Sequence, residues 1–107
     1  MKICIYGASK ERIDSIYIEK SYEFGAMLSK KGHTMLFGGG ATGLMGAAAR
    51  GVMDNSGQIT GISPKYFDMP GVLIKDYGNM VFTDTISERK NLLIKEADAF
   101  VILPGGI

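Results

Sequence analysis

Residues 37–46 form the stretch FGGGATGLMG, and five of these ten residues are glycine. The stretch follows an expected strand at residues 34–37 and precedes an expected helix at residues 44–54. It satisfies G-x-G-x-x-G in the strand–turn–helix context that this pattern needs. Backbone without side chains lets an anion approach the amides at the start of a helix, where the helix dipole favours negative charge. We therefore predict a phosphate-binding turn; the alternative is a tight turn with close helix packing through Gly43 and Gly46.

The position of this turn argues against an ordinary dinucleotide site. The glycine pattern follows the second expected strand rather than the first. The next strand ends in Ile62, Ser63 and Pro64, so the carboxylate that reads a ribose in dinucleotide sites is missing there. What remains is the general expectation that a phosphate approaches this backbone closely.

Strands and helices alternate along the sequence. Short apolar runs predict strands at residues 2–6, 34–37, 58–62, 79–83 and 99–103, and helices are expected at residues 14–31, 44–54 and about 85–96. Such alternation predicts an α/β fold in which helices cover both faces of a parallel sheet. Ligands bind at the carboxyl ends of the strands in such sheets. The apolar face of the first helix is expected to consist of Ile13, Ile16, Tyr17, Phe24, Met27 and Leu28.

The composition fits one small soluble domain. The chain has 107 residues, of which 46% are apolar and 21% charged, and its formal net charge is +1. Because no basic block or long apolar segment occurs, neither a nucleic-acid polymer nor a membrane is expected as a partner. The single cysteine, Cys4, excludes a disulfide framework and favours a cytoplasmic location. Paired histidines and cysteine clusters are absent, so neither a metal nor a cofactor is predicted.

A second cluster, Ser87-Glu88-Arg89-Lys90, lies in the first turn of the last expected helix. Because that helix starts at the carboxyl end of a strand, a cation there can hold a phosphate or a ribose hydroxyl, and arginine suits fork-like recognition. Arg89 and Lys90 point about 100° apart on a helix, so one can face the pocket while the other reaches around it. The alternative is a solvated helix face on which Glu88 pairs locally.

Three segments together resemble the LOG ("lonely guy") family. Gly38 to Gly46 resembles its GGGxxGLMG segment, Glu88-Arg89-Lys90 its ERK segment, and Pro104-Gly105-Gly106 the start of its PGGxGTxxE motif. Tyr6-Gly7-Ala8-Ser9 also resembles the family's first phosphate-side turn. The segments occur in the family's order, and the likeness spans nearly all of the chain. It implies a Rossmann-like sheet and a homodimer.

The resemblance implies a phosphoribohydrolase, which cleaves the N-glycosidic bond of a nucleoside 5′-monophosphate and releases a free base and ribose 5-phosphate. Because cleavage builds positive charge on the ribose, a carboxylate is needed beside the cations that hold the phosphate. The resemblance makes Arg89 catalytic, together with the glutamate of PGGxGTxxE. The substrate-binding residues that it implies are Ser9, Gly39, Gly40, Thr42, Gly43, Met45, Arg89, Lys90, Pro104, Gly105 and Gly106. The alternative function is non-catalytic nucleotide binding, which needs only the glycine turns and Arg89.

The chain stops at Ile107, before the Gly-Thr and the glutamate of that motif. We therefore expect residues 1–107 to form a single nucleotide-binding domain that is incomplete on the C-terminal side of the sheet. We expect the isolated chain to show little or no hydrolase activity. It is either the N-terminal piece of a longer enzyme, which we prefer, or one of two polypeptides that complete each other, or a shortened non-catalytic relative.

Overall fold

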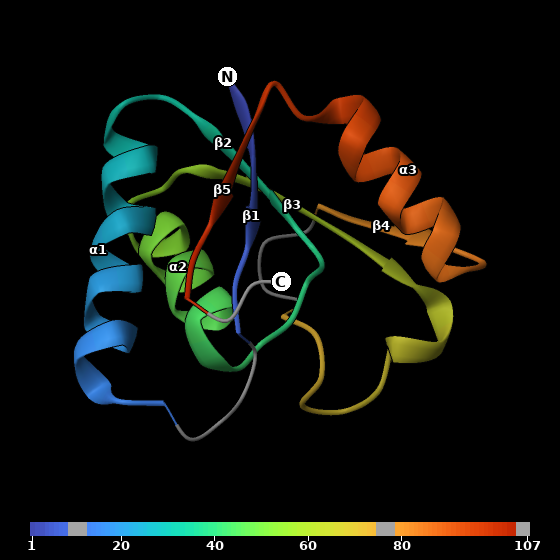
Figure 1. The fold of residues 1–107 in the computed structure, drawn as a ribbon, viewed down its shortest axis with the longest axis horizontal. Helices are drawn as coiled ribbons and strands as arrows, with labels where there is room; N and C mark the ends of the chain where they lie inside the picture. The colour runs from blue at the N-terminus through green and yellow to red at the C-terminus, as the bar shows by residue number, and fades with distance from the viewer. Residues whose placement is uncertain (9–12, 75–78, 105–107) are drawn as a thin grey trace.

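The computed structural model describes residues 1–8, 13–74 and 79–104. Its centre is a parallel five-stranded sheet with the strand order β4-β3-β2-β1-β5 (Figure 1). The strands are β1 (Lys2–Tyr6), β2 (Thr34–Phe37), β3 (Gln58–Pro64), β4 (Met80–Thr83) and β5 (Ala99–Ile102). In the register of the central strands, Ile3 of β1 lies beside Met35 of β2 and Ala99 of β5. The predicted parallel α/β sheet is therefore confirmed.

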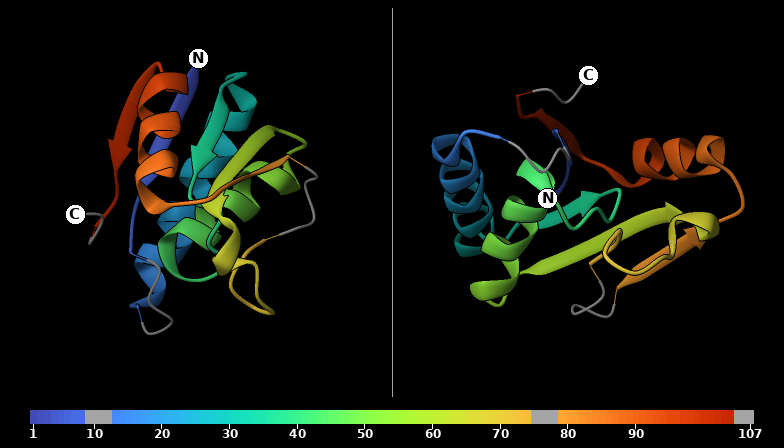
Figure 2. Two further views of the ribbon diagram at one scale, coloured as in Figure 1. Left: turned by 90° about the vertical axis from the view of Figure 1, so that its right-hand side faces the viewer. Right: turned by 90° about the horizontal axis from the view of Figure 1, so that it is seen from below.

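Helices cover both faces of this sheet, as the alternation of elements predicts. They are α1 (Ser15–Lys30), α2 (Gly43–Asp54) and α3 (Ile86–Glu96), and a short 3-10 helix, η1 (Lys65–Phe67), follows β3. Helices α1 and α2 lie together on one face, and α3 lies on the other (Figures 1 and 2). In the described parts of the chain, no helix combines the length and the apolar character needed to cross a bilayer.

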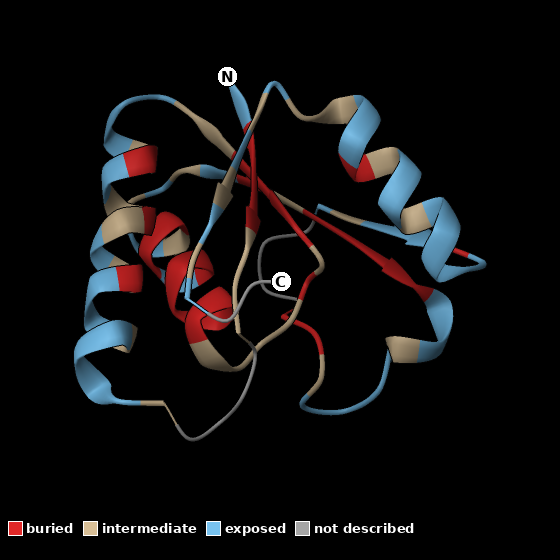
Figure 3. Ribbon diagram, in the orientation of Figure 1, coloured by how far each residue is buried: buried red, intermediate tan, exposed pale blue. Residues whose placement is uncertain are grey.

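Alternate residues of the strands fill the two layers. Ile5 of β1 and Phe37 of β2 belong to the core under α1 and α2, whereas Cys4 and Leu36 pack with Leu93 of α3. Figure 3 shows that buried residues are concentrated in the central strands and on α2, while α3 is mostly exposed. The α3 layer is therefore thin, and it leaves room for a cavity at the carboxyl ends of β1 and β2.

The buried surface of α1 differs from the predicted apolar face. Its buried residues are Ser21, Gly25 and Leu28, and Phe24 packs against the core. The prediction is wrong for Ile16, Tyr17 and Met27, which are 47%, 50% and 40% exposed. The physical reason is that α1 and α2 are in backbone contact, because a Cβ at Gly25 would overlap the carbonyl oxygen of Ala48. A large side chain has no room between the two helices.

The reactivity of the Cys4 thiol tests whether α3 covers its face of the sheet. Cys4 has no exposed surface, and burial raises the pKa of its thiol, opposed by a hydrogen bond with Tyr6. Since the thiolate is the reactive form, we expect alkylation by iodoacetamide at pH 8 to be about 100-fold slower in the folded chain than in urea. Mass spectrometry over time measures both rates. Equal rates would contradict the burial of Cys4.

Candidate functional site

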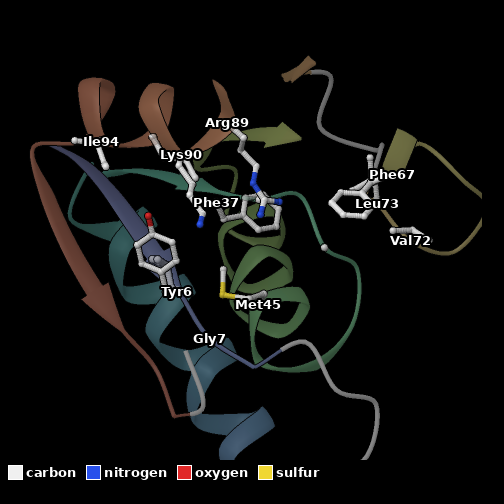
Figure 4. A pocket seen from close by; sticks show the side chains of 14 residues that line it. Tyr6, Gly7, Phe37, Met45, Phe67, Val72, Leu73, Arg89, Lys90 and Ile94 are labelled. Atoms are coloured by element: carbon white, nitrogen blue, oxygen red, sulfur yellow. The ribbon is translucent and has the colours of Figure 1, made fainter. Parts of the chain in front are cut away.

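A cavity of about 400 Å³ opens at the carboxyl ends of β1 and β2, between α3 and the glycine turn. Strand β1 ends at it with Tyr6, β2 ends at it with Phe37, and Met45 of α2 contributes to its floor (Figure 4). From α3, the cationic side chains of Arg89 and Lys90 extend into it. This is the edge of a parallel sheet at which ligands are expected to bind.

Both cations of the second cluster line the same cavity. Arg89 is half-buried and Lys90 is exposed, and both side chains point toward Phe37 in Figure 4. Both side chains therefore face the cavity. Both side chains are long enough to converge from positions about 100° apart on the helix. Among the described lining residues there is no aspartate or glutamate, so the cavity carries positive charge.

The Arg89 guanidinium lies near Phe67 and Gly38, and its charge acts on Tyr6. Its central carbon lies 6.0 Å from the centre of the Phe67 ring. A Cβ built on Gly38 would lie 3.1 Å from its Nη1 atom. Burial raises the pKa of the Tyr6 hydroxyl, and the charge of Arg89 opposes this shift with a smaller downward effect. The Nε atom of Arg89 is buried and has no hydrogen-bond partner among the described residues.

The first three glycines of the turn have different neighbours. Gly38 faces the guanidinium of Arg89, whereas Gly39 has φ +88° and lies against the side chain of Met80. Apart from its chain neighbours, no described residue has an atom within 4 Å of a Cβ built on Gly40. Because Gly40 also lines the cavity, it is the glycine of this turn that leaves open space for a ligand.

The start of α2 is more closely packed than the phosphate-binding interpretation assumes. The amide of Leu44 donates to the carbonyl of Ala8 at 2.8 Å, so this amide already has a protein partner. A Cβ at Gly46 would overlap the carbonyl of Ala41, and Gly43 has φ +65°. At Gly43 and Gly46 the structure therefore agrees with the alternative, a tight turn and close packing.

The cavity brings together part of the predicted set. Gly40, Met45, Arg89 and Lys90 line it. The described residues Gly39, Thr42, Gly43 and Pro104 do not line it. Ser9, Gly105 and Gly106 lie outside the described residues. In the described ranges, no group of three or more acidic, histidine or cysteine residues could hold a metal ion.

An apolar wall of the cavity was not predicted from the sequence. It consists of Phe67, Val72 and Leu73, from the segment between β3 and β4 that the sequence leaves irregular. Backbone hydrogen bonds fix this wall beside the glycine turn, from Ala41 to Val72 at 3.0 Å and from Ile74 to Gly39 at 2.9 Å. The one feature of the sequence that could have indicated this wall is that its apolar residues follow the carboxyl end of a strand.

Substitution of Gly38 tests whether this glycine makes room for Arg89. We expect Gly38→Ala to displace the guanidinium, because a contact of 3.1 Å is tighter than an ordinary Cβ contact. The Arg89 Nε–H resonance in an NMR spectrum of the ligand-free chain measures the displacement. Gly40→Ala is the matched control, since its Cβ meets open space. An unmoved resonance in Gly38→Ala would show that Gly38 does not constrain Arg89.

Known proteins resemble this chain in sequence or in fold. A cytokinin riboside 5′-monophosphate phosphoribohydrolase of Mycobacterium tuberculosis is 34% identical over 90 residues, which are 84% of this chain and 48% of that protein. The enzyme LOG of Oryza sativa subsp. japonica, with the same activity in its name, is 32% identical over 98% of this chain and 43% of its own length. The chain thus spans about half the length of the curated relatives it matches. The predicted relation to LOG enzymes is confirmed.

A solved structure shares the architecture at lower identity. The molybdenum cofactor binding protein of the phototrophic bacterium Rippkaea orientalis matches 99% of this chain, and 63% of its own chain, with a TM-score of 0.81. Its sequence identity of 21% means that this likeness shows the Rossmann-type fold alone. A family model described as the SLOG cluster4 family matches residues 1–107. Because that match extends from the first residue to the last, this chain belongs to the SLOG cluster4 family.

Proposed function

We propose that this chain forms the nucleotide-binding part of a nucleoside 5′-monophosphate phosphoribohydrolase. The observation that carries the proposal is the convergence of Arg89 and Lys90 on a cavity that also contains the open backbone of Gly40. Two relatives that bear this activity in their names support it. The substrate is a nucleoside monophosphate, with AMP or a cytokinin nucleotide as the candidates.

The chemistry divides between the two sides of the cavity. Arg89 and Lys90 supply the cations that an anionic phosphate or a ribose oxygen needs, and Val72 and Leu73 of the apolar wall suit a flat base. Hydrolysis of the N-glycosidic bond also needs a carboxylate to stabilise the charge that develops on the ribose. We assign that role to the glutamate of the PGGxGTxxE motif, in a protein whose chain continues through it.

Substrate contacts at the remaining predicted positions are part of this proposal. Ser9, Gly105 and Gly106, which follow β1 and β5 in the sequence, would contact the nucleotide. Gly39, Thr42, Gly43 and Pro104 do not line the ligand-free cavity, and we assign them contacts that form through their backbone when the nucleotide binds. Met45, which lines the cavity, would contact the nucleotide through its side chain.

Binding of AMP and of adenosine to the purified chain tests the site. We expect AMP to bind at least about tenfold more tightly than adenosine, because only AMP carries the phosphate that pairs with Arg89 and Lys90. Isothermal titration calorimetry at low salt measures both affinities. Equal affinities would contradict the assignment of the cations to phosphate.

The products identify the reaction. A protein that contains this domain and continues through the complete motif is expected to convert AMP to adenine and ribose 5-phosphate, which chromatography separates. Formation of adenosine and inorganic phosphate instead would identify a phosphatase and overturn the proposal. AMP binding without turnover would support the second candidate, a non-catalytic nucleotide-binding protein, for which the cavity and Arg89 suffice.

We further propose that residues 1–107 act as one domain, in the cytoplasm, within a homodimer. Phe100 and Ile102 support association, since they are 47% and 54% exposed on the edge strand β5. Light scattering coupled to size-exclusion chromatography tests the dimer. A mass of about 11.5 kDa across the concentration range would show a monomer.

A further inference from the structure

We propose that Phe67 is a positioning residue, whose ring holds the Arg89 guanidinium in the orientation that binds the substrate. The ring centre lies 6.0 Å from the guanidinium carbon, near the outer limit of an effective cation–π contact. Figure 4 shows the Phe67 ring to the right of the end of the Arg89 side chain. The inference rests on the proposed function only in its choice of AMP as the probe.

The hydrogen-bonding state of Arg89 explains why a ring suits this role. Its Nε atom is buried and has no partner among the described residues. A buried unpaired donor costs free energy until an acceptor reaches it, so an oxygen of a ligand is the group that it lacks. An aromatic face attracts a cation without occupying its N–H groups. Phe67 can therefore hold the guanidinium while its donors remain available to the substrate.

Phe67 lies in a segment close to the start of the helix that carries Arg89. Phe67 ends η1, and its ring makes an edge contact with the Tyr66 ring, with centres 4.9 Å apart. Lys65, the first residue of η1, forms an ion pair at 3.0 Å with Asp84, which lies just before the N-cap of α3. The ion pair is exposed, so it marks the proximity of η1 and α3 more than it stabilises them.

Space on the neighbouring side of the guanidinium is also restricted. The backbone of Gly38 lies so close that a Cβ there would be 3.1 Å from Nη1. A bulkier residue at position 38 would push the guanidinium away. The ring of Phe67 and the bare backbone of Gly38 thus act together on the orientation of Arg89.

The test is a set of substitutions at Phe67, with AMP as the ligand of the purified chain. We expect Phe67→Leu to weaken AMP binding about three- to tenfold, because leucine fills space but has no π face. Phe67→Tyr keeps the face and is expected to bind within about twofold of the unsubstituted chain. Tyr17→Leu is the matched control, an aromatic-to-leucine change at a 50% exposed site on α1. Circular dichroism verifies that each variant folds.

A double-mutant cycle separates positioning from direct contact with the ligand. In an Arg89→Ala background we expect Phe67→Leu to cause no further loss of AMP affinity, because the group that it positions is gone. If Phe67→Leu weakens binding equally in both backgrounds, the ring acts on the ligand directly and the proposal is overturned. If Phe67→Tyr binds as weakly as Phe67→Leu, the π face is not the cause and the proposal also fails.

The Nε–H resonance of Arg89 supplies a readout that does not depend on AMP. We expect Phe67→Leu to shift this resonance and to speed its exchange with solvent, whereas Phe67→Tyr and Tyr17→Leu leave it in place. If the unsubstituted chain fails to bind AMP, the proposed function fails, and this resonance still decides the role of Phe67. A resonance that is unchanged in Phe67→Leu overturns the inference whatever AMP does.

Discussion

Arg89→Ala is expected to weaken AMP binding by about 10- to 100-fold, the loss that corresponds to one or two hydrogen bonds from a charged donor. Arg89 is half-buried in the cavity, and its Nε has no partner among the described residues. A substrate oxygen is therefore the acceptor that the side chain needs, and alanine offers no donor. Calorimetric titration of the purified variant measures the loss.

The control must separate this contact from the general charge of α3. Lys95→Ala removes one positive charge from the same helix at an exposed position that does not line the cavity. At about 0.15 M salt we expect it to change AMP affinity by less than about twofold, because salt then screens a surface charge beyond about 8 Å. If Arg89→Ala and Lys95→Ala have the same small effect, Arg89 is not a binding residue.

Stability provides a second, independent readout of Arg89. If the Arg89 side chain stabilised the fold, its removal would lower the free energy of unfolding. The buried, unpaired Nε instead costs free energy in the ligand-free chain, so Arg89→Ala is expected to unfold at the same or a higher urea concentration. Loss of affinity without loss of stability is the pattern of a functional residue. Loss of both AMP affinity and stability would show that Arg89 mainly stabilises the fold.

The order and type of the elements were predictable because each has a local signal. Buried parallel strands are short apolar runs, and the glycines and prolines between the elements mark the turns. The Thr85 hydroxyl accepts from the amide of Glu88 and so caps the start of α3, and threonine is a common residue at this position. Strand β3 extends two residues further than expected, to Pro64, because β4 pairs with it there.

The site was predictable only where a motif marks it. Arg89, Lys90 and Gly40 lie in recognisable segments, and all three line the cavity. Phe67 and Leu73 lie in a segment without periodicity, and hydrogen bonds to the glycine turn place that segment. Such contacts join residues far apart in the sequence, so no local pattern reveals them. The cations of the cavity could therefore be predicted from the sequence, whereas its apolar wall was found only in the structure.

The interface between α1 and α2 could not be predicted from the sequence either, for a different reason. Periodicity identifies large apolar side chains, but here the helices meet through glycine backbone. Gly25 of α1 faces the carbonyl of Ala48, and Gly51 of α2 faces the carbonyl of Tyr22. A helical glycine is an unfavourable choice by propensity, so close packing is the physical reason for both.

This packing predicts a large effect for a single methyl group. Gly25→Ala is expected to destabilise the chain by about 3 kcal/mol, because the new Cβ would overlap the Ala48 carbonyl and separate two backbones. Propensity alone predicts the opposite sign, since alanine stabilises a helix relative to glycine by about 0.5–1 kcal/mol. Urea unfolding followed by circular dichroism measures the free energy of unfolding.

The sign of the change in the free energy of unfolding decides whether close packing or helix propensity dominates at Gly25. Gly51→Ala is expected to destabilise similarly, because its Cβ would overlap the Tyr22 carbonyl across the same interface. Glu19→Ala, at an exposed position of α1, is the control and is expected to change stability by less than about 0.5 kcal/mol. If Gly25→Ala unfolds at a higher urea concentration than the unsubstituted chain, α1 and α2 are not in backbone contact. A loss at both glycines, with none at Glu19, identifies the contact of the two backbones as the constraint that keeps large side chains out of this interface.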